Sequence, residues 1–219
     1  MSRSRVLGLI PARGGSKRLP GKNLADLHGR SLLQRAIDAG LAARGIDRLI
    51  VSTDDPAIAE AARAGGAEVP FLRPAELATD EASSLDVVRH AMDWADQDEP
   101  GAFSHLVLLQ PTSPLRTAGD IDQTLTLCRD QDRSTAVSVT PAPKPDVLMI
   151  GQGGVLRPAS EYGHPLILNG AVYVLKWDHL NIGGAFIAPD TAYHVMDQHR
   201  SVDVDTSDDL DRAAKILKS

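Results

Sequence analysis

The sequence predicts an α/β protein with a mostly parallel β-sheet. Short apolar runs typical of buried strands alternate with segments of helical periodicity through the first two thirds of the chain. Glycines and cationic side chains gather directly after the first apolar run, which is where open α/β folds bind ligands. A chain of 219 residues is long enough for one such domain with a sizeable core.

The first part of the chain predicts strand, helix, strand, helix, strand. We expect the strands at Val6–Ile10, Arg48–Ser52 and Ala67–Phe71. The first helix begins at a capping box of Ser31 with Gln34, and its apolar face consists of Leu33, Ala36, Ile37, Gly40 and Leu41. The second has Asp55 as its cap, Pro56 at its first position and Gly65–Gly66 after its end. This alternation predicts parallel strands with right-handed crossovers.

The later elements follow the same pattern at first. We expect a helix carrying Val88 and Met92, a strand at His105–Leu109, a helix at Gly119–Arg129 and a strand at Thr135–Thr140. The pattern then breaks, and sheet character returns at Leu168–Val174. The last helix is capped by Thr206 or Ser207 and packs through Leu210, Ala213, Ala214 and Leu217.

The loop after the first strand predicts a phosphate site. Gly14 and Gly15 can bring the backbone close to a ligand and turn its N–H groups toward it. Four cationic side chains lie in the same stretch: Arg13, Lys17, Arg18 and Lys22. The spacing matches neither G-x-x-x-x-G-K-[ST] nor G-x-G-x-x-G. A solvated basic loop is the alternative interpretation.

Two acidic residues near the end of the chain predict a metal site. On a strand at Ser201–Thr206, Asp203 and Asp205 would share one face while Val202 and Val204 point inward. Adjacent carboxylates repel unless a cation or a proton neutralises them, and Mg²⁺ suits such oxygen ligands. The alternative is ion pairing with arginines such as Arg200.

Composition narrows the function classes. The net charge of −6 argues against a nucleic-acid surface, which usually needs a positive field. The single cysteine, Cys128, excludes an internal disulfide and suits a reducing compartment. No apolar stretch approaches the ~20 residues of a membrane span. We therefore expect a cytoplasmic protein that binds neither nucleic acid nor membrane.

The stretch from Ala12 to Asn23 has the spacing Ala-Arg-x-Gly-Ser-Lys-x-x-x-x-Lys-Asn. It resembles the first motif of the CMP-sialic acid synthetases, the acylneuraminate cytidylyltransferases, and four later segments resemble further motifs of that family in order. The resemblance implies a Rossmann-like nucleotidyltransferase fold in one domain over residues 1–219. It also implies a homodimer, with a small dimerisation and sugar-pocket arm inserted at about 141–168.

The same resemblance implies which residues bind CTP. They are Arg13, Gly14, Gly15, Ser16, Lys17, Lys22, Asn23, Arg73 and Ser84. Arg73 would contact the cytosine, although a surface ion pair with Glu76 is the alternative. Ser84 would contact the nucleoside, although a serine before a helix is often only a cap.

The sugar-binding residues implied by the family are Gln110, Asn169, Tyr173 and Phe186. Tyr173 and Phe186 could instead be simple aromatic residues of the core. Arg116, in Gln-Pro-Thr-Ser-Pro-Leu-Arg, is expected to tie loops together. The chain departs from the sialic acid enzymes at Ile167, where they carry an arginine, and at Ala185, where they carry a ring. A differently decorated nine-carbon sugar is therefore expected.

The reaction implied is transfer of CMP from CTP to the C2 hydroxyl of a nine-carbon 3-deoxy-2-ulosonic acid, with release of pyrophosphate. Arg13, Lys22 and Asp205 would be catalytic, with Mg²⁺ on Asp203 and Asp205. The group that accepts the hydroxyl proton is left open, since a metal-bound water is as good a candidate as any side chain. A 3-deoxy-manno-octulosonate cytidylyltransferase and a non-catalytic nucleotide-binding regulatory module are the alternatives.

Overall fold

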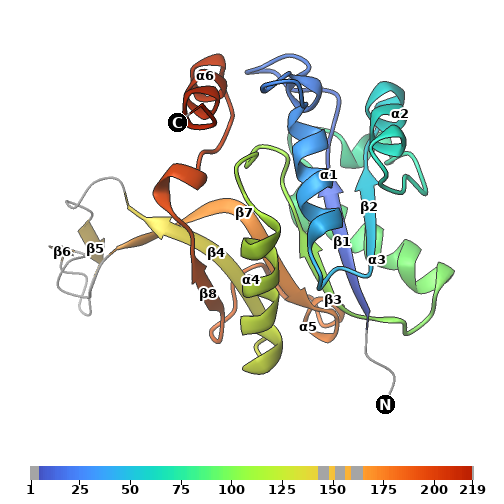
Figure 1. Ribbon diagram of the computed structural model, residues 1–219. Coiled ribbons are helices and arrows are strands. Elements are labelled where there is room, and N and C mark those ends of the chain that lie inside the picture. Colours follow the sequence, from blue (N-terminus) through green and yellow to red (C-terminus); the bar gives the residue numbers. More distant parts are fainter. Residues whose placement is uncertain (1–4, 143–147, 151–155, 159–164, 219) are drawn as a thin grey trace.

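The protein is built on a six-stranded sheet with strand order β2-β1-β3-β7-β4-β8 (Figure 1). A computed structural model describes residues 5–142, 148–150, 156–158 and 165–218. Neighbouring strands are parallel except at β7, which runs antiparallel to β3 and β4, so the prediction of a mostly parallel α/β sheet is confirmed. The strands are β1 (Arg5–Pro11), β2 (Arg48–Ser52), β3 (Phe103–Leu108), β4 (Thr135–Pro141), β7 (Leu166–Lys176) and β8 (Ala192–Val195).

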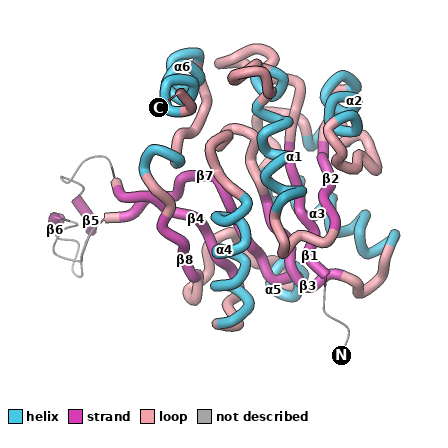
Figure 2. The backbone as a smooth tube through the Cα atoms, in the orientation of Figure 1, coloured by secondary structure: helices cyan, strands magenta, loops and turns pink. Residues whose placement is uncertain are grey.

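Helices cover both faces of this sheet (Figure 2). One apolar cluster joins the sheet to α1 (Leu32–Ala42), α2 (Pro56–Ala64) and α4 (Ala118–Asp130). A second cluster on the other face joins it to α3 (Ser84–Asp98) and α5 (Trp177–Asn181). Strand β1 is buried on both sides because it contributes to both clusters, which explains its uninterrupted apolar sequence.

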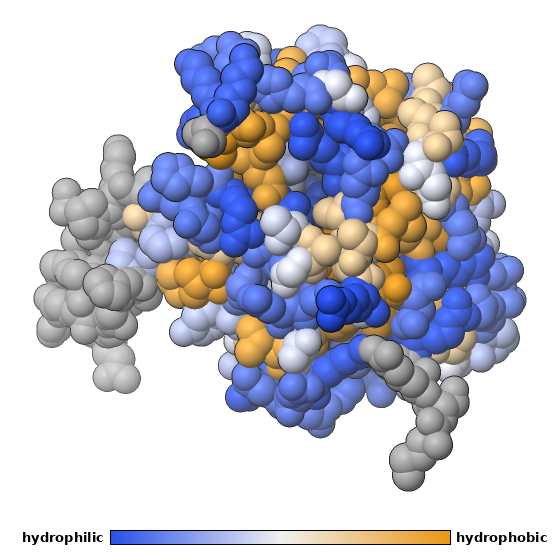
Figure 3. Space-filling model, viewed as in Figure 1, coloured by the Kyte–Doolittle hydropathy of each residue, from blue (hydrophilic) through white to orange (hydrophobic). Residues whose placement is uncertain are grey.

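The C-terminal helix α6 (Ser207–Ile216) packs separately from these layers. Its Ala213 joins a third apolar cluster with Val202, Val204 and Leu115. Small apolar patches interrupt an otherwise hydrophilic face in Figure 3, which is ordinary for a protein surface. No described helix is long and apolar enough to span a membrane.

The residues expected to start α1, α2 and α6 do so, but the capping box predicted for Ser31 and Gln34 forms only in its first half. Ser31 accepts a hydrogen bond from the Gln34 backbone N–H, while the Gln34 side chain turns to Asp38 at 2.8 Å. Asp55 caps α2 with Pro56 at the first position. Thr206 caps α6 and Ser83, not Ser84, caps α3.

Three structural predictions were wrong. The stretch Ala67–Phe71 is no strand. It makes one isolated bridge, from Glu68 to Ile50 of β2, and a second bridge joins the next residue, Leu72, to Thr53. A continuous ladder does not form because Pro70 lacks the N–H that it needs. The stretch Ser201–Thr206 is an irregular extended segment. Two leucines expected to pack, Leu41 and Leu217, are exposed.

The predicted arm is only partly visible. Strand β5 (Leu148–Ile150) pairs antiparallel with β6 (Leu156–Pro158), and the pair lies beside the β4 and β7 end of the main sheet in Figure 1. The other residues of 143–164 lie outside the described part of the chain. The role of the arm in dimerisation therefore stays a prediction.

Candidate active site

Two clefts meet at the carboxyl edge of the parallel strands. The first cleft, about 400 Å³, holds most of the predicted nucleotide-binding residues and is lined by Arg13, Ser16, Lys22, Asn23, Arg73, Asp80, Ser84, Thr112 and others. The second cleft, about 600 Å³, is lined by Ile167, Asn169, Tyr173, His199, Arg212 and others. Among the described residues, Gln110 and Asp203 alone line both clefts. Groups bound in the two clefts would meet at these side chains.

The four cations of the first loop pair with only two carboxylates. Arg13 NH2 lies 2.6 Å from Asp80 Oδ1, and Lys17 also pairs with Asp80. Lys22 Nζ and Arg18 NH2 each lie 2.9 Å from an oxygen of Asp205. The hydrogen bonds from Lys17 and Arg13 lower the pKa of the Asp80 carboxyl. The cations of this loop are thus held by carboxylates, and a phosphate would have to take the place of these partners.

The two glycines of this loop behave differently. The Gly14 N–H donates to Asp54 Oδ1 at 3.0 Å, so its predicted role of presenting that N–H to a phosphate is wrong. A Cβ at Gly14 would lie 2.6 Å from Asp55 Oδ2, so close packing accounts for this glycine. Gly15 has open space around its Cα, which leaves room for a ligand. Neither glycine nor Lys17 lines the first cleft.

Arg73 is a buried residue of the first cleft. Its guanidinium donates to Ser52 Oγ at 3.0 Å and to the carbonyls of Ser52 and Leu77. The alternative of a surface pair with Glu76 is wrong, because only 6% of Arg73 is exposed. Burial, opposed by the charge of Asp54, lowers its pKa to about 10. Arg73 stays charged at neutral pH and braces the wall of the cleft.

Asn23 and Ser84 also reach the first cleft from well-defined positions. The 3₁₀ helix η1 (Lys22–Leu24) carries Asn23, whose Nδ2 donates to the Arg13 carbonyl at 2.8 Å and fixes the loop. Ser84 is the first residue of α3, and since Ser83 caps that helix, the Ser84 hydroxyl is not needed as its cap. Their contacts with a nucleotide remain predictions.

Asp203 and Asp205 lie together although their segment is no strand. The Val204 N–H donates to the Thr112 carbonyl at 2.7 Å, and Val202 and Val204 are buried while the acids face outward. Desolvation raises the pKa of the Asp203 carboxyl and the nearby charge of Asp205 adds to this, opposed by a hydrogen bond with Thr112. A neighbouring cation would therefore stabilise the charged form of Asp203.

This pair fits Mg²⁺ as two hard oxygen donors. No cluster of three or more His, Cys, Asp or Glu side chains that could hold a metal exists among the described residues. Phosphate oxygens and water would have to complete the shell, which is the coordination that Mg²⁺ commonly takes beside phosphates.

The second cleft contains three of the predicted sugar-binding residues. Gly170 has φ +73°, and a Cβ there would lie 3.3 Å from Gln110 Oε1, so the glycine leaves space for Gln110. Tyr173 lines the cleft, and Phe186 packs on Tyr173 with ring centroids 5.2 Å apart but does not itself line it. Ile167 lines the cleft, whereas Ala185 does not. The missing ring at Ala185 therefore does not alter the lining of this cleft.

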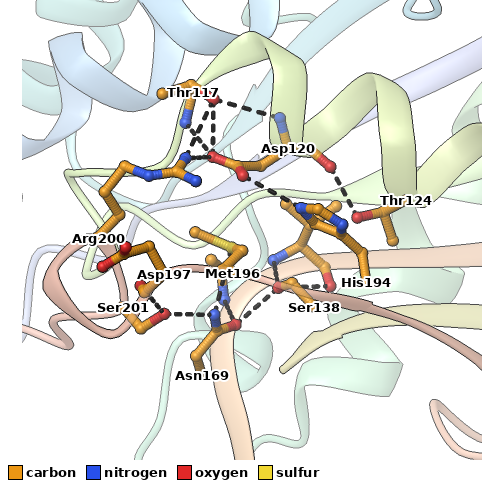
Figure 4. Close-up of polar contacts among 12 residues, drawn as sticks. Thr117, Asp120, Thr124, Ser138, Asn169, His194, Met196, Asp197, Arg200 and Ser201 are labelled. Atoms are coloured by element: carbon orange, nitrogen blue, oxygen red, sulfur yellow. Dashed lines mark hydrogen bonds and ion pairs between the residues drawn. The ribbon is translucent and has the colours of Figure 1, made fainter. Parts of the chain in front are cut away.

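The side-chain amide of Asn169 has hydrogen-bond partners for both its oxygen and its nitrogen. Its Oδ1 accepts from Ser138 Oγ at 2.7 Å and from the Ala171 N–H, and its Nδ2 donates to Ser201 Oγ and Met196 Sδ (Figure 4). These contacts use both lone pairs and both N–H groups. Asn169 lines the second cleft, so its contact with sugar stays a prediction, and in this arrangement its side chain holds the segment that leads to Asp203.

A buried carboxylate anchors the same segment from the other side. Asp120 is 3% exposed, and Figure 4 shows it between Thr117, His194 and Arg200. His194 Nε2 lies 3.2 Å from Asp120 Oδ1, and Arg200 of the 3₁₀ helix η5 (Gln198–Arg200) pairs with Oδ2. Burial opposes the charge, but these contacts outweigh it and lower the pKa of Asp120. Arg200 therefore serves Asp120 and not the acidic pair.

Arg116 ties two loops together, as expected. It is 5% exposed and donates to the Ala171 carbonyl at 2.6 Å and to the Gln110 carbonyl at 2.7 Å. Burial, opposed by the charge of Asp120, lowers its pKa to about 9. It thereby fixes the backbone of Gln110 between the clefts.

Sequence reasoning missed the contributions of Asp80 and Asp120 to the site. Asp80 lies in a polar loop whose fold depends on distant cations, so no local pattern identifies it. Asp120 forms a capping box with Thr117 that the sequence does display, Thr-x-x-Asp, but its distant partners are not readable from it.

The fold and the two clefts define an α/β nucleotide-binding protein with cations and paired carboxylates at the sheet edge. The family described as Cytidylyltransferase matches residues 7–146, and the chain belongs to this family.

The chain is similar to several characterised proteins. It is 30% identical over 98% of its length to an N-acylneuraminate cytidylyltransferase of Escherichia coli, but spans only 52% of that relative. It is 33% identical to a CMP-N,N'-diacetyllegionaminic acid synthase of Legionella pneumophila, covering 98% of this chain and 97% of the relative. A solved CMP:2-keto-3-deoxy-manno-octonic acid synthetase complexed with CTP has a TM-score of 0.76 at 21% identity, covering 98% and 99% of the two chains. That structural likeness shows the fold.

Proposed function

We propose that the protein transfers CMP from CTP to the C2 hydroxyl of a nine-carbon 3-deoxy-2-ulosonic acid and releases pyrophosphate. The observation that carries this proposal is the meeting of the two clefts at Gln110 and Asp203. A nucleotide in the first cleft and a sugar acid in the second would bring the α-phosphorus and the C2 hydroxyl together there. The names of the Escherichia coli and Legionella relatives support the same class of reaction.

Catalysis in this arrangement is positioning and charge neutralisation. The C2 oxygen forms a bond to the α-phosphorus while the bond from that phosphorus to the bridging oxygen of pyrophosphate breaks, and the hydroxyl proton is released. Lys22 and Arg13 would contact the phosphates, exchanging their carboxylate partners for phosphate oxygens. Mg²⁺, held by Asp203 and Asp205, would supply further neutralisation of phosphate charge. Which group accepts the proton stays open.

A pyrophosphate-release assay with CTP tests this function. We expect release with nine-carbon ulosonic acids and little with 3-deoxy-manno-octulosonate. A marked preference for the eight-carbon acid would favour the alternative transferase, and nucleotide binding without any release would favour a regulatory module. The homodimer, the requirement for Mg²⁺ and a cytoplasmic location belong to the same proposal.

The preferred sugar is proposed to be a legionaminic- or pseudaminic-type acid rather than N-acetylneuraminate. Ile167 supports this, since it gives the second cleft an apolar wall at the position of an arginine in the sialic acid enzymes. A pocket without a partner for a hydroxyl gains little from that hydroxyl. Comparing kcat/KM for the three acids at saturating CTP tests the proposal, and a clear preference for N-acetylneuraminate would contradict it.

A further inference from the structure

The second cleft is poor in positive charge. Among its described lining residues, Arg212 is the one side chain with a permanent positive charge, while Asp203 contributes an acid. A ulosonic acid brings a carboxylate into this cleft, and an unpaired charge is costly to desolvate. The cleft therefore needs a cation for its ligand.

Arg212 is available for this role. Its side chain is 60% exposed, and among the described residues its one ion-pair partner is Asp209 Oδ1 at 3.3 Å. A guanidinium has five N–H donors, so most of them are free to bind a carboxylate in the bidentate manner. Arg212 and Ile216 lie four residues apart on α6, and both line the cleft, so this face of the helix forms one of its walls.

The position of Arg212 also suits the chemistry. The carboxylate of a 2-ulosonic acid is bonded to the carbon that bears the attacking hydroxyl, so its anchor must lie near the junction of the clefts. Asp203, a residue of that junction, lines the same cleft as Arg212, and Asp209 joins Arg212 to the acidic segment, since its Oδ2 accepts from the Asp205 backbone N–H at 3.2 Å. We propose that Arg212 binds the carboxylate of the sugar acid, an inference that rests on the proposed function.

The first test compares Michaelis constants. Arg212→Gln should raise KM for the sugar acid by about tenfold or more while KM for CTP stays near wild type, because only the carboxylate loses its partner. Arg212→Lys should recover part of the loss. Lys215→Gln is the matched control: it removes one positive charge from the same helix at an exposed position that does not line the cleft. An unchanged sugar KM in Arg212→Gln would overturn the inference.

The second test identifies the ligand group. Calorimetry would compare binding of N-acetylneuraminic acid, N,N'-diacetyllegionaminic acid and their C1 methyl esters to wild type and Arg212→Gln. Esterification should weaken binding to wild type but have little effect on Arg212→Gln. An equal ester effect in both proteins would overturn the assignment while the proposed function stands. A wild type that turns over none of the acids with CTP overturns the function and this inference together.

Discussion

Lys22 Nζ lies 2.9 Å from Asp205 Oδ1, so the first loop and the acidic segment are joined directly across the nucleotide cleft. Both side chains are partly buried, 15% and 29% exposed, and Arg18 shares the same carboxylate. Each of the two residues thus neutralises the charge of the other.

Asp205→Ala should lose most of the activity while the fold survives. The change removes one of the two oxygen donors proposed for Mg²⁺ and leaves Lys22 without its partner, but it touches no apolar core. Pyrophosphate release with and without EDTA measures activity, and thermal unfolding checks the fold. Asp208→Ala, an exposed acid in the same helix start, is the control and should retain full activity. Normal turnover by Asp205→Ala with Mg²⁺ would show that the metal assignment is wrong.

Asp80→Asn should lower KM for CTP modestly. Asp80 engages Arg13 and Lys17, so phosphates must displace it before those cations can bind them. The pairs are solvent-exposed, and the expected gain is only about two- to fivefold. Glu81→Gln makes the same change of charge on the next, exposed residue and should leave KM unaltered. A raised KM in Asp80→Asn would instead mean that Asp80 helps to hold the nucleotide.

Arg73→Ala should weaken the binding of CTP more than the binding of the sugar acid. The substitution removes a cation from the first cleft and also breaks bonds to Ser52 and Leu77, so some loss of thermal stability is expected as well. Separate Michaelis constants for the two substrates decide its role. If the Michaelis constants for CTP and for the sugar acid rise equally, Arg73 acts only by stabilising the fold.

Acid should destabilise the protein through His105. Burial lowers the pKa of this histidine to about 4 from its ordinary value of 6.5, so the folded state binds its proton less well than the unfolded state. The stabilisation is complete above pH 6.5 and is lost as the pH falls toward 4, by up to about 3 kcal/mol.

Denaturant unfolding of wild type and His105→Asn over this range measures the effect. The asparagine amide can still form a hydrogen bond at the position of Nδ1, which lies 2.8 Å from Ser104 Oγ. The variant should lose less stability between pH 6.5 and 4 than wild type. Parallel pH profiles in the two proteins would rule out His105 as the source.

Local signals were readable from the sequence because they act over a few residues. The caps at Ser31, Asp55 and Thr206 and the burial of β1 all follow from short patterns. The prediction of a cytidylyltransferase is confirmed by the family match, and it came from ordered motifs rather than from composition.

Long-range relationships were not readable in the same way. Nothing in Leu166–Lys176 shows that β7 enters the sheet antiparallel between β3 and β4, since strand order depends on which distant strands pair. The saturation of Asn169 depends on Ser138 and Ser201, which are about 30 residues away on either side. Pro70 was visible, but its effect on the neighbouring strand was underestimated.

The separation of 183 positions between Lys22 and Asp205 in the sequence also affects biosynthesis. A nascent chain exposes its cationic loop early, and its sheet strands are all present once Val195 has been made. Asp203, Asp205 and the apolar residues that hold them, Val202 and Val204, come only afterwards. Closing so long a loop costs entropy that this late packing must offset. Prematurely terminated chains can therefore have every strand of the sheet and yet lack the acidic half of the site, so partial products should have no residual activity.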